Sequence, residues 1–241
     1  MTTRVSFEGK SGTQGSGELA EPEGTGRVPA VILLQEHWGV NDHIRDLTDR
    51  LAAEGFVVLA PDLYHGKVAR DAAEAMELMK ALDTLAAVDE IARAVAFVRA
   101  HPRSTGKVGV VGFCMGGALA LATACHLAGI GAAVSFYGIP PAEKVDYREV
   151  TAPVLMHVGT RDEWVTVGKA EAIKQQIEAR EKDVPRLTQQ EREDGYPSVA
   201  IEVYDANHAF VNDTRPEVHD PASTKLAWDR TVAFLRRHLR S

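Results

Sequence analysis

The sequence is poor in the features that would assign it to several specialised classes of protein. It contains only two cysteines, Cys114 and Cys125, which stand in one predicted elbow-and-helix segment, so it encodes no disulfide framework and suits a reducing compartment. Its longest apolar runs fall well short of the roughly 18 residues that a membrane helix needs. Positive charge is not in excess either, because the net charge is −7 at pH 7. We therefore expect neither a nucleic-acid partner nor a membrane partner.

The N-terminal residues 1–10 contain no basic stretch followed by an apolar one, which is the pattern of a secretory signal. A cytoplasmic location is therefore the expectation. With 45% hydrophobic and 25% charged residues, the chain has the composition of a soluble globular protein. Its length of 241 residues fits one α/β domain over residues 1–241.

Apolar segments of strand length alternate with helical segments along most of the chain. After a predicted hairpin within residues 4–20, this alternation is typical of a largely parallel sheet covered by helices on both faces. The charge-rich stretch 180–197 is the exception and predicts a surface excursion or a lid. The predicted strands are 30–35, 56–60, 107–112, 131–136, 153–158 and 199–204. The predicted helices are 42–54, 72–100 in two pieces broken near 82–84, 114–128, 167–180 and 223–238.

The turn between the strand 107–112 and the following helix carries the most informative motif. Gly112, Cys114 and Gly116 form the G-x-S-x-G pattern of a nucleophile elbow, with cysteine in place of serine. Glycine is needed on both sides because the turn is strained and the helix passes close to the strand it leaves. The partial positive charge of the helix N-terminus favours a thiolate. We therefore expect Cys114 to be the nucleophile of a cysteine-dependent hydrolase.

Two further polar residues follow predicted strands at the point where each strand ends. Asp162 comes after strand 153–158, and His208 comes after strand 199–204. Ligands collect at the carboxyl ends of parallel strands, so these side chains are expected to converge on Cys114. The order nucleophile, acid, histidine is that of the α/β-hydrolase fold. The sequence therefore predicts a Cys114–His208–Asp162 triad, in which Asp162 orients the histidine that serves as base.

The segment 35–39, Gln-Glu-His-Trp-Gly, occupies the place of the loop that supplies one oxyanion-hole amide. We expect the backbone N–H groups of His37 and Met115 to be the two donors. Glu36 is unusual because a carboxylate beside a thiolate disfavours the resting anion. Alternatively, Glu36 accepts the thiol proton if it can swing towards Cys114.

Together these motifs resemble those of the dienelactone hydrolase (carboxymethylenebutenolidase) family. The resemblance spans about residues 28–240 and is carried by Asp162 and by segments 35–39, 60–64, 112–117, 136–138 and 207–210. It implies a single α/β-hydrolase domain that opens the lactone ring of dienelactones during the breakdown of chlorinated aromatics. It also implies that a glutamate corresponding to Glu36 holds the thiol neutral until substrate arrives and then takes its proton.

The chain departs from the family pattern at the positions that bind the substrate carboxylate. Asn212 stands four positions beyond His208, where the family has an arginine, and Arg70 is the nearest candidate for a second arginine. His37 is an unusual middle residue for the Gln-Glu loop. Because an amide replaces a bidentate arginine poorly, the substrate is expected to be another lactone, or a larger or less anionic ester.

Several aromatic residues flank the predicted site loops and are expected to line an apolar pocket, with core packing as the alternative: Trp38, Tyr64, Tyr137, Trp164 and Phe210. Cys125 is expected to be a packing residue, and Asp162 has the alternative role of a helix N-cap before Val165. The remaining histidines show no ligand spacing, so no metal and no other cofactor are expected.

The function predicted from the sequence is two-step acyl transfer on a small-molecule ester or lactone, by a monomer or a small homo-oligomer. A general carboxylesterase or thioesterase of the same fold is the alternative. A non-catalytic binding protein of this fold and a thiol-redox protein are further alternatives. The first would be expected to lack part of the triad, and the second would need a resolving partner that Cys125, inside its helix, does not readily provide.

Overall fold

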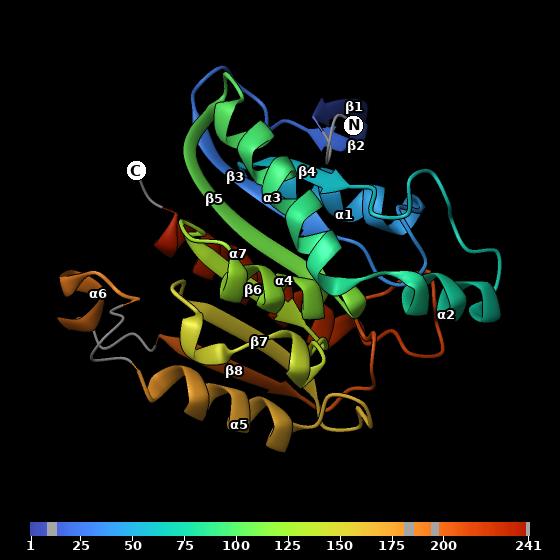
Figure 1. Cartoon of the computed structure of the whole chain (residues 1–241), viewed down its shortest axis with the longest axis vertical. Helices are drawn as coiled ribbons and strands as arrows, with labels where there is room; N and C mark the ends of the chain where they lie inside the picture. The colour runs from blue at the N-terminus through green and yellow to red at the C-terminus, as the bar shows by residue number, and fades with distance from the viewer. Residues whose placement is uncertain (9–13, 181–185, 194–197, 240–241) are drawn as a thin grey trace.

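The computed structural model describes residues 1–8, 14–180, 186–193 and 198–239. Its centre is an eight-stranded sheet in the order β1-β2-β4-β3-β5-β6-β7-β8 (Figure 1). From β4 to β8 the neighbouring strands are parallel, whereas β1 and β2 form an antiparallel hairpin that pairs antiparallel with β4. The predicted mostly parallel sheet is confirmed. The strands are β1 (Thr3–Glu8), β2 (Gln14–Ala20), β3 (Val28–Leu34), β4 (Val57–Pro61), β5 (Ser104–Phe113), β6 (Ala132–Phe136), β7 (Val154–Gly159) and β8 (Val199–Tyr204).

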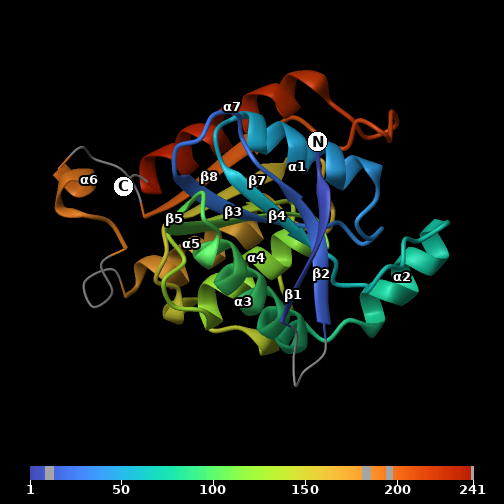
Figure 2. The same ribbon diagram turned by 90° about the horizontal axis from the view of Figure 1, so that it is seen from above.

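Helices cover both faces of this sheet, as Figure 2 shows: α1 and α7 lie on one face, and α3, α4 and α5 lie on the other. Alternate residues of a strand point to opposite faces, so the central strands are apolar throughout. In β3, for example, Ile32 packs with the helices of one face and Leu33 with those of the other. The helices are α1 (Asp42–Ala53), α2 (Ala72–Ala81), α3 (Thr84–Ala100), α4 (Met115–His126), α5 (Val167–Glu178), α6 (Gln189–Glu193) and α7 (Pro221–His238).

The helical stretch 72–100 is broken where the sequence predicts it. Helix α2 ends at Ala81, and the side chain of Asp83 accepts a 2.9 Å hydrogen bond from the N–H of Ala86 in the first turn of α3. Such a cap satisfies an N–H group that has no partner within its own helix. The junction between α2 and α3 is therefore a defined bend.

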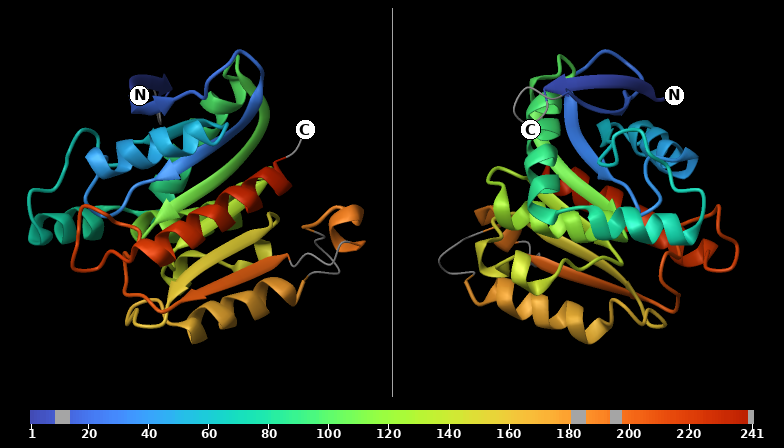
Figure 3. Two further views of the ribbon diagram at one scale, coloured as in Figure 1. Left: turned by 180° about the vertical axis from the view of Figure 1, so that it is seen from behind. Right: turned by 45° about the vertical axis from the view of Figure 1, so that its right-hand side comes forward.

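The described part of segment 180–197 lies at the amino ends of the strands, away from the ends where the site is expected (Figures 1 and 3). Arg186 donates a 2.7 Å hydrogen bond to the carbonyl oxygen of Val150. Oε1 of Glu191 in α6 lies 2.6 Å from Nδ1 of His238, the last residue of α7. The alternative that this segment forms a lid over the site is therefore wrong for these residues, and the rest of the segment lies outside the described residues. Among the described helices, none combines the length and the apolar character needed to cross a bilayer.

Candidate active site

Cys114 occupies the turn between β5 and α4 in a conformation that residues with a side chain rarely adopt. Its φ is 54° and its ψ is −115°, and its N–H donates a 3.0 Å hydrogen bond to the carbonyl oxygen of Phe136 in β6. A Cβ atom at Gly112 would overlap the carbonyl oxygen of Gly116, and a Cβ at Gly116 would overlap that of Leu34. Both glycines are thus required by close backbone approach. A strained backbone of this kind costs roughly 1–3 kcal/mol and is common at functional sites.

The structure brings Cys114, His208 and Asp162 together at the carboxyl ends of the strands. His208 follows β8, and its Nε2 lies 3.3 Å from Cys114 Sγ. Its Nδ1 lies 2.8 Å from Oδ2 of Asp162, which follows β7. Along the chain, His208 lies 46 positions after Asp162 and 94 positions after Cys114. The parallel order of the strands accounts for this convergence, because it brings the three loops to one edge of the sheet.

Hydrogen bonds hold the histidine in its charged form. Burial lowers the pKa of His208, but the hydrogen bonds with Asp162 and Cys114 outweigh burial and raise this pKa to about 10. A bond between a charged imidazole and a carboxylate is stronger than one between neutral partners. The imidazole is therefore placed to accept a proton from the sulfur.

Asp162 is fixed by the backbone that follows it. Burial raises its pKa, but the bond with His208 and those from the N–H groups of Val165 and Trp164, each 2.9 Å from Oδ1, lower it overall. Asp162 is not the N-cap of α5, because Thr166 caps that helix. The alternative role as a helix cap is therefore wrong. The same carboxylate nevertheless orders the turn between β7 and α5.

A second imidazole also reaches the sulfur. Nδ1 of His37, in the loop after β3, lies 3.8 Å from Cys114 Sγ. Burial, together with the charges of Arg215 and His208, lowers the pKa of His37 to about 4. The ring also packs on Trp38, with 4.8 Å between ring centroids. The side chain is thus turned towards the site and not towards solvent. No motif in the sequence indicated this contact of the His37 side chain with the sulfur.

Glu36 is buried in the wall behind the site, with 2% of its surface exposed. Burial raises its pKa, and its Oε2 accepts a 2.7 Å hydrogen bond from Nδ2 of Asn212. Its Oε1 and the Tyr137 hydroxyl are both buried without a well-formed hydrogen bond. Burial, together with the charges of Glu36 and Cys114, raises the pKa of Tyr137. Glu36, Tyr137 and Cys114 therefore form one electrostatically linked group.

A cavity of about 850 Å³ opens onto Cys114 and His208. Two of the aromatic residues expected to line it, Tyr137 and Trp164, do so, together with Met115. Part of the wall is the junction of α2 and α3, residues 79–84, which no motif of the sequence indicated. Three lysines, Lys80, Lys144 and Lys169, also border the cavity.

Five residues expected at the substrate lie outside the cavity wall, and each has another role or partner. Phe210 is fully buried in the core. The Tyr64 hydroxyl lies 3.2 Å from the sulfur of Met115, and the ring of Trp38 packs against the ring of His37. Arg70 is exposed and paired with Glu74 in α2, and Asn212 holds Glu36. None of these five residues therefore lines this cavity, and for Phe210 the structure agrees with the alternative of core packing.

The described residues contain no group of three or more His, Cys, Asp or Glu side chains that could hold a metal ion. Cys125, within α4, packs against the core, and burial raises the pKa of its thiol to about 12. A thiol in this state is a poor partner for redox exchange with Cys114.

Comparison with known proteins agrees with the geometry. A model of the dienelactone hydrolase family matches residues 16–239. A protein of Aquifex pyrophilus named usf is 34% identical, over 99% of this chain and 100% of that protein. A carboxymethylenebutenolidase from a Pseudomonas species is 31% identical, over 98% of this chain and 96% of the enzyme. A solved structure from Klebsiella pneumoniae, named provisionally as a dienelactone hydrolase, has a TM-score of 0.84 and 26% identity, and the match covers 98% of each chain. The chain therefore belongs to the dienelactone hydrolase family and is a carboxylic-ester hydrolase.

Proposed function

We propose that the protein hydrolyses a lactone or carboxylic ester through an acyl-enzyme on Cys114. The observation that carries this proposal is the continuous contact from Cys114 Sγ to His208 at 3.3 Å and from His208 to Asp162 at 2.8 Å. A nucleophile next to a base, with the base held by a third group, is the arrangement that covalent catalysis requires.

In the acylation step, Nε2 of His208 takes the proton of Cys114, and the sulfur attacks the carbonyl carbon of the substrate. The new carbon–sulfur bond converts the carbonyl oxygen into an oxyanion. When this intermediate collapses, the bond to the ester or ring oxygen breaks, and His208 returns its proton to that oxygen. The product of the step is a thioester on Cys114.

In the deacylation step, His208 takes a proton from water, and the resulting hydroxide attacks the thioester. The carbon–sulfur bond breaks, the carboxylic acid product leaves, and the thiolate and the imidazolium are regenerated. Asp162 keeps the imidazole in one orientation and stabilises its positive charge throughout.

The oxyanion hole is proposed to consist of the backbone N–H groups of His37 and Met115. Met115 is the first residue of α4, where the N–H groups have no acceptor within the helix. His37 lies in the facing loop, with its side chain against the same sulfur. Loss of one such donor typically costs about 10²–10³ in rate. The tight approach of β5, α4 and the loop after β3 at Gly112 and Gly116 supports this assignment, because it holds both backbones close together.

A dienelactone-type enol lactone is the proposed substrate, because relatives of this chain carry the name carboxymethylenebutenolidase. A general carboxylesterase or thioesterase activity is the second candidate. It is favoured by the cavity of about 850 Å³ and by the side chain of Asn212, which is committed to Glu36 and unavailable to a substrate carboxylate. A cavity of this size exceeds what one small lactone ring fills.

The test compares the parent with Cys114→Ala and with Cys125→Ala as the matched control. The substrates are a dienelactone and p-nitrophenyl esters of increasing acyl length, each with and without a carboxylate. We expect Cys114→Ala to abolish turnover while circular dichroism shows an intact fold, and Cys125→Ala to keep it. Brief mixing of the parent with ester should add the acyl mass to the protein. Turnover by Cys114→Ala equal to that of the parent would exclude the proposed mechanism.

A further inference from the structure

One ion pair joins two walls of the cavity that opens onto Cys114. Nζ of Lys144 lies 3.5 Å from Oδ2 of Asp83, and both residues line the cavity. Lys144 ends the 3₁₀ helix η2 (Ala142–Lys144), which follows β6, and Asp83 lies at the junction of α2 and α3. We propose that this pair closes the end of the cavity remote from Cys114 and so limits the length of the acyl group that the enzyme accepts. The inference rests on the proposed function and deepens its second candidate, a general carboxylesterase.

Helix α4 separates the ion pair from the nucleophile. Cys114 directly precedes this helix, and Ala118 and Leu119 in its first turns line the cavity. His126 is its last residue, and Nε2 of His126 lies 2.8 Å from the carbonyl oxygen of Lys144. At about 1.5 Å per residue, the 12 residues of α4 span about 18 Å. The backbone of Lys144 is therefore about one helix length away from Cys114.

The cavity is lined mainly by apolar side chains. Besides those of α4, they come from the α2–α3 junction and from the segment after β6, which are the two segments that carry the ion pair: Met79, Leu82, Ile139, Pro140 and Pro141. Each methylene group of a substrate that is buried against such a lining contributes favourably to binding. A chain long enough to reach the ion pair must instead separate two opposite charges. The pair therefore marks the boundary of the apolar part of the cavity.

The acyl group is the part of the substrate that we assign to this apolar lining. His208 returns its proton to the leaving oxygen, so the alcohol lies on the His208 side of the carbonyl carbon. The acyl chain is bonded to the other side of that carbon, and it stays on Cys114 after the alcohol has left. In the proposed arrangement it extends along α4 towards the ion pair.

The ion pair is of the kind that substrate and salt can open. The exposed fractions of the two side chains are 35% for Lys144 and 57% for Asp83. Pairs exposed to this degree are weak and are screened by salt. Asp83 also caps α3, because its side chain accepts a 2.9 Å hydrogen bond from the N–H of Ala86. Asparagine caps a helix about as well as aspartate, so Asp83→Asn removes the ion pair and keeps the cap.

The experiment measures kcat/KM for uncharged p-nitrophenyl esters, from acetate to decanoate, at low and at high salt. The variants that break the pair are Lys144→Gln and Asp83→Asn, and Lys144→Arg keeps the pair as the conservative control. Lys144→Gln removes a positive charge and Asp83→Asn removes a negative one. An effect that both variants share therefore comes from loss of the pair and not from a change in net charge.

In the parent, kcat/KM should rise with acyl length up to the length that reaches the pair and then fall. For esters beyond that length, Lys144→Gln and Asp83→Asn should raise the ratio of kcat/KM to that for acetate about two- to fivefold, mainly through a lower KM for the long ester. High salt should raise this ratio in the parent more than in either variant, and Lys144→Arg should behave as the parent does.

A ratio that fails to rise in both variants, or that rises equally in Lys144→Arg, would overturn the proposal. The ratio is measured in proteins that retain Cys114, whereas the nucleophile is tested by loss of turnover in Cys114→Ala. A failure of the ion pair therefore leaves the proposed function standing, and a failure of the nucleophile is seen separately.

Discussion

Nδ2 of Asn212 donates a 2.7 Å hydrogen bond to Oε2 of Glu36 and so joins two strand-end loops that lie 176 residues apart. The orientation of the amide is set by Thr214, whose N–H and hydroxyl donate to Oδ1 of Asn212 at 3.1 and 2.6 Å. Both partners of the bond are buried. Position 212, where the family resemblance implies an arginine that grips substrate, therefore serves here to hold a buried carboxylate in the wall of the site.

A double-mutant cycle should measure the coupling between Asn212 and Glu36. Asn212→Ala leaves the buried carboxylate without its donor and should lower the free energy of unfolding by about 1–3 kcal/mol. In a Glu36→Ala background the same substitution should cost about 1–2 kcal/mol less, because the acceptor is absent. Urea unfolding at neutral pH gives the free energies of unfolding of the parent, the two single variants and the double variant. Additive single effects would show that the two side chains are not coupled.

Removal of the charge of Glu36 should make Cys114 more reactive. The charges of Glu36 and Cys114 both act on the hydroxyl of Tyr137, so the carboxylate and the sulfur lie close enough to repel when both are ionised. We expect iodoacetamide to alkylate Cys114 of Glu36→Ala at least about threefold faster than Cys114 of the parent at neutral pH. Glu36→Gln keeps the side-chain volume and is the matched control for the loss of charge. Slower or unchanged alkylation in both variants would refute the repulsion.

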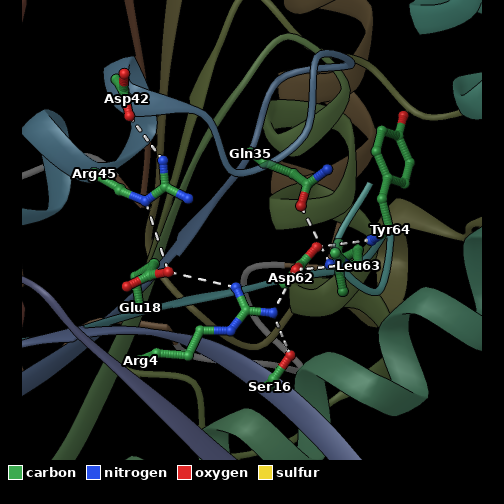
Figure 4. Close-up of polar contacts among 10 residues, drawn as sticks. Arg4, Ser16, Glu18, Gln35, Asp42, Arg45, Asp62, Leu63 and Tyr64 are labelled. Atoms are coloured by element: carbon green, nitrogen blue, oxygen red, sulfur yellow. Dashed lines mark hydrogen bonds and ion pairs between the residues drawn. The ribbon is translucent and has the colours of Figure 1, made fainter. Parts of the chain in front are cut away.

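Asp62 ties the N-terminal hairpin to the loop after β4, as Figure 4 shows. Its Oδ2 accepts 2.8 Å bonds from Arg4 and from the N–H of Gly66, and its Oδ1 accepts a 3.3 Å bond from the N–H of Tyr64. Asp62→Ala leaves these donors unpaired and should lower the free energy of unfolding by about 2–4 kcal/mol. Asp62→Asn keeps one acceptor oxygen, so it should lower the free energy of unfolding by less than Asp62→Ala does. A loss below about 0.5 kcal/mol in Asp62→Ala, the range of an ordinary surface change, would contradict this account.

His157 should make the fold sensitive to acid. It is fully buried in β7, with Nδ1 2.8 Å from the Tyr204 hydroxyl and Nε2 2.9 Å from Thr231 Oγ1 of α7. Burial, with a smaller contribution from Arg230, lowers its pKa from 6.5 to about 3.

The unfolded chain therefore binds a proton at His157 below pH 6.5 that the folded chain does not bind until pH falls to about 3. The free energy of unfolding should fall over this window by up to about 1.4 kcal/mol per pH unit from this group. His157→Gln lacks the titration, so its difference from the parent should shrink between pH 6.5 and pH 4.5. Urea unfolding at several pH values measures this difference. Parallel stability curves would show that His157 does not titrate in this way.

Much of the fold could be predicted from local patterns. The apolar runs 30–35 and 199–204 specify strands because a strand buried on both faces needs apolar residues at every position. The bend between α2 and α3 could be predicted at 82–84, where Asp83 can cap a new helix. The lid alternative for 180–197 failed because a charge-rich composition indicates a surface segment without indicating which edge of the sheet it covers.

The convergence of Cys114, His208 and Asp162 could also be predicted from the sequence, because parallel strands bring their carboxyl ends to one edge and the polar residues follow those ends directly. The partners of Asn212 and His37 could not, because each depends on side-chain orientations between loops that are far apart in the chain. The wall at 79–84 was missed for a similar reason, since no motif marks residues that meet the site only through packing. The sequence alone therefore determined the order of the elements and the residues proposed to carry the chemistry, which follow from local apolar pattern and backbone geometry. Only the tertiary structure decided which side chains contact the Glu36 carboxyl group and the Cys114 sulfur, because those contacts arise from packing between distant segments.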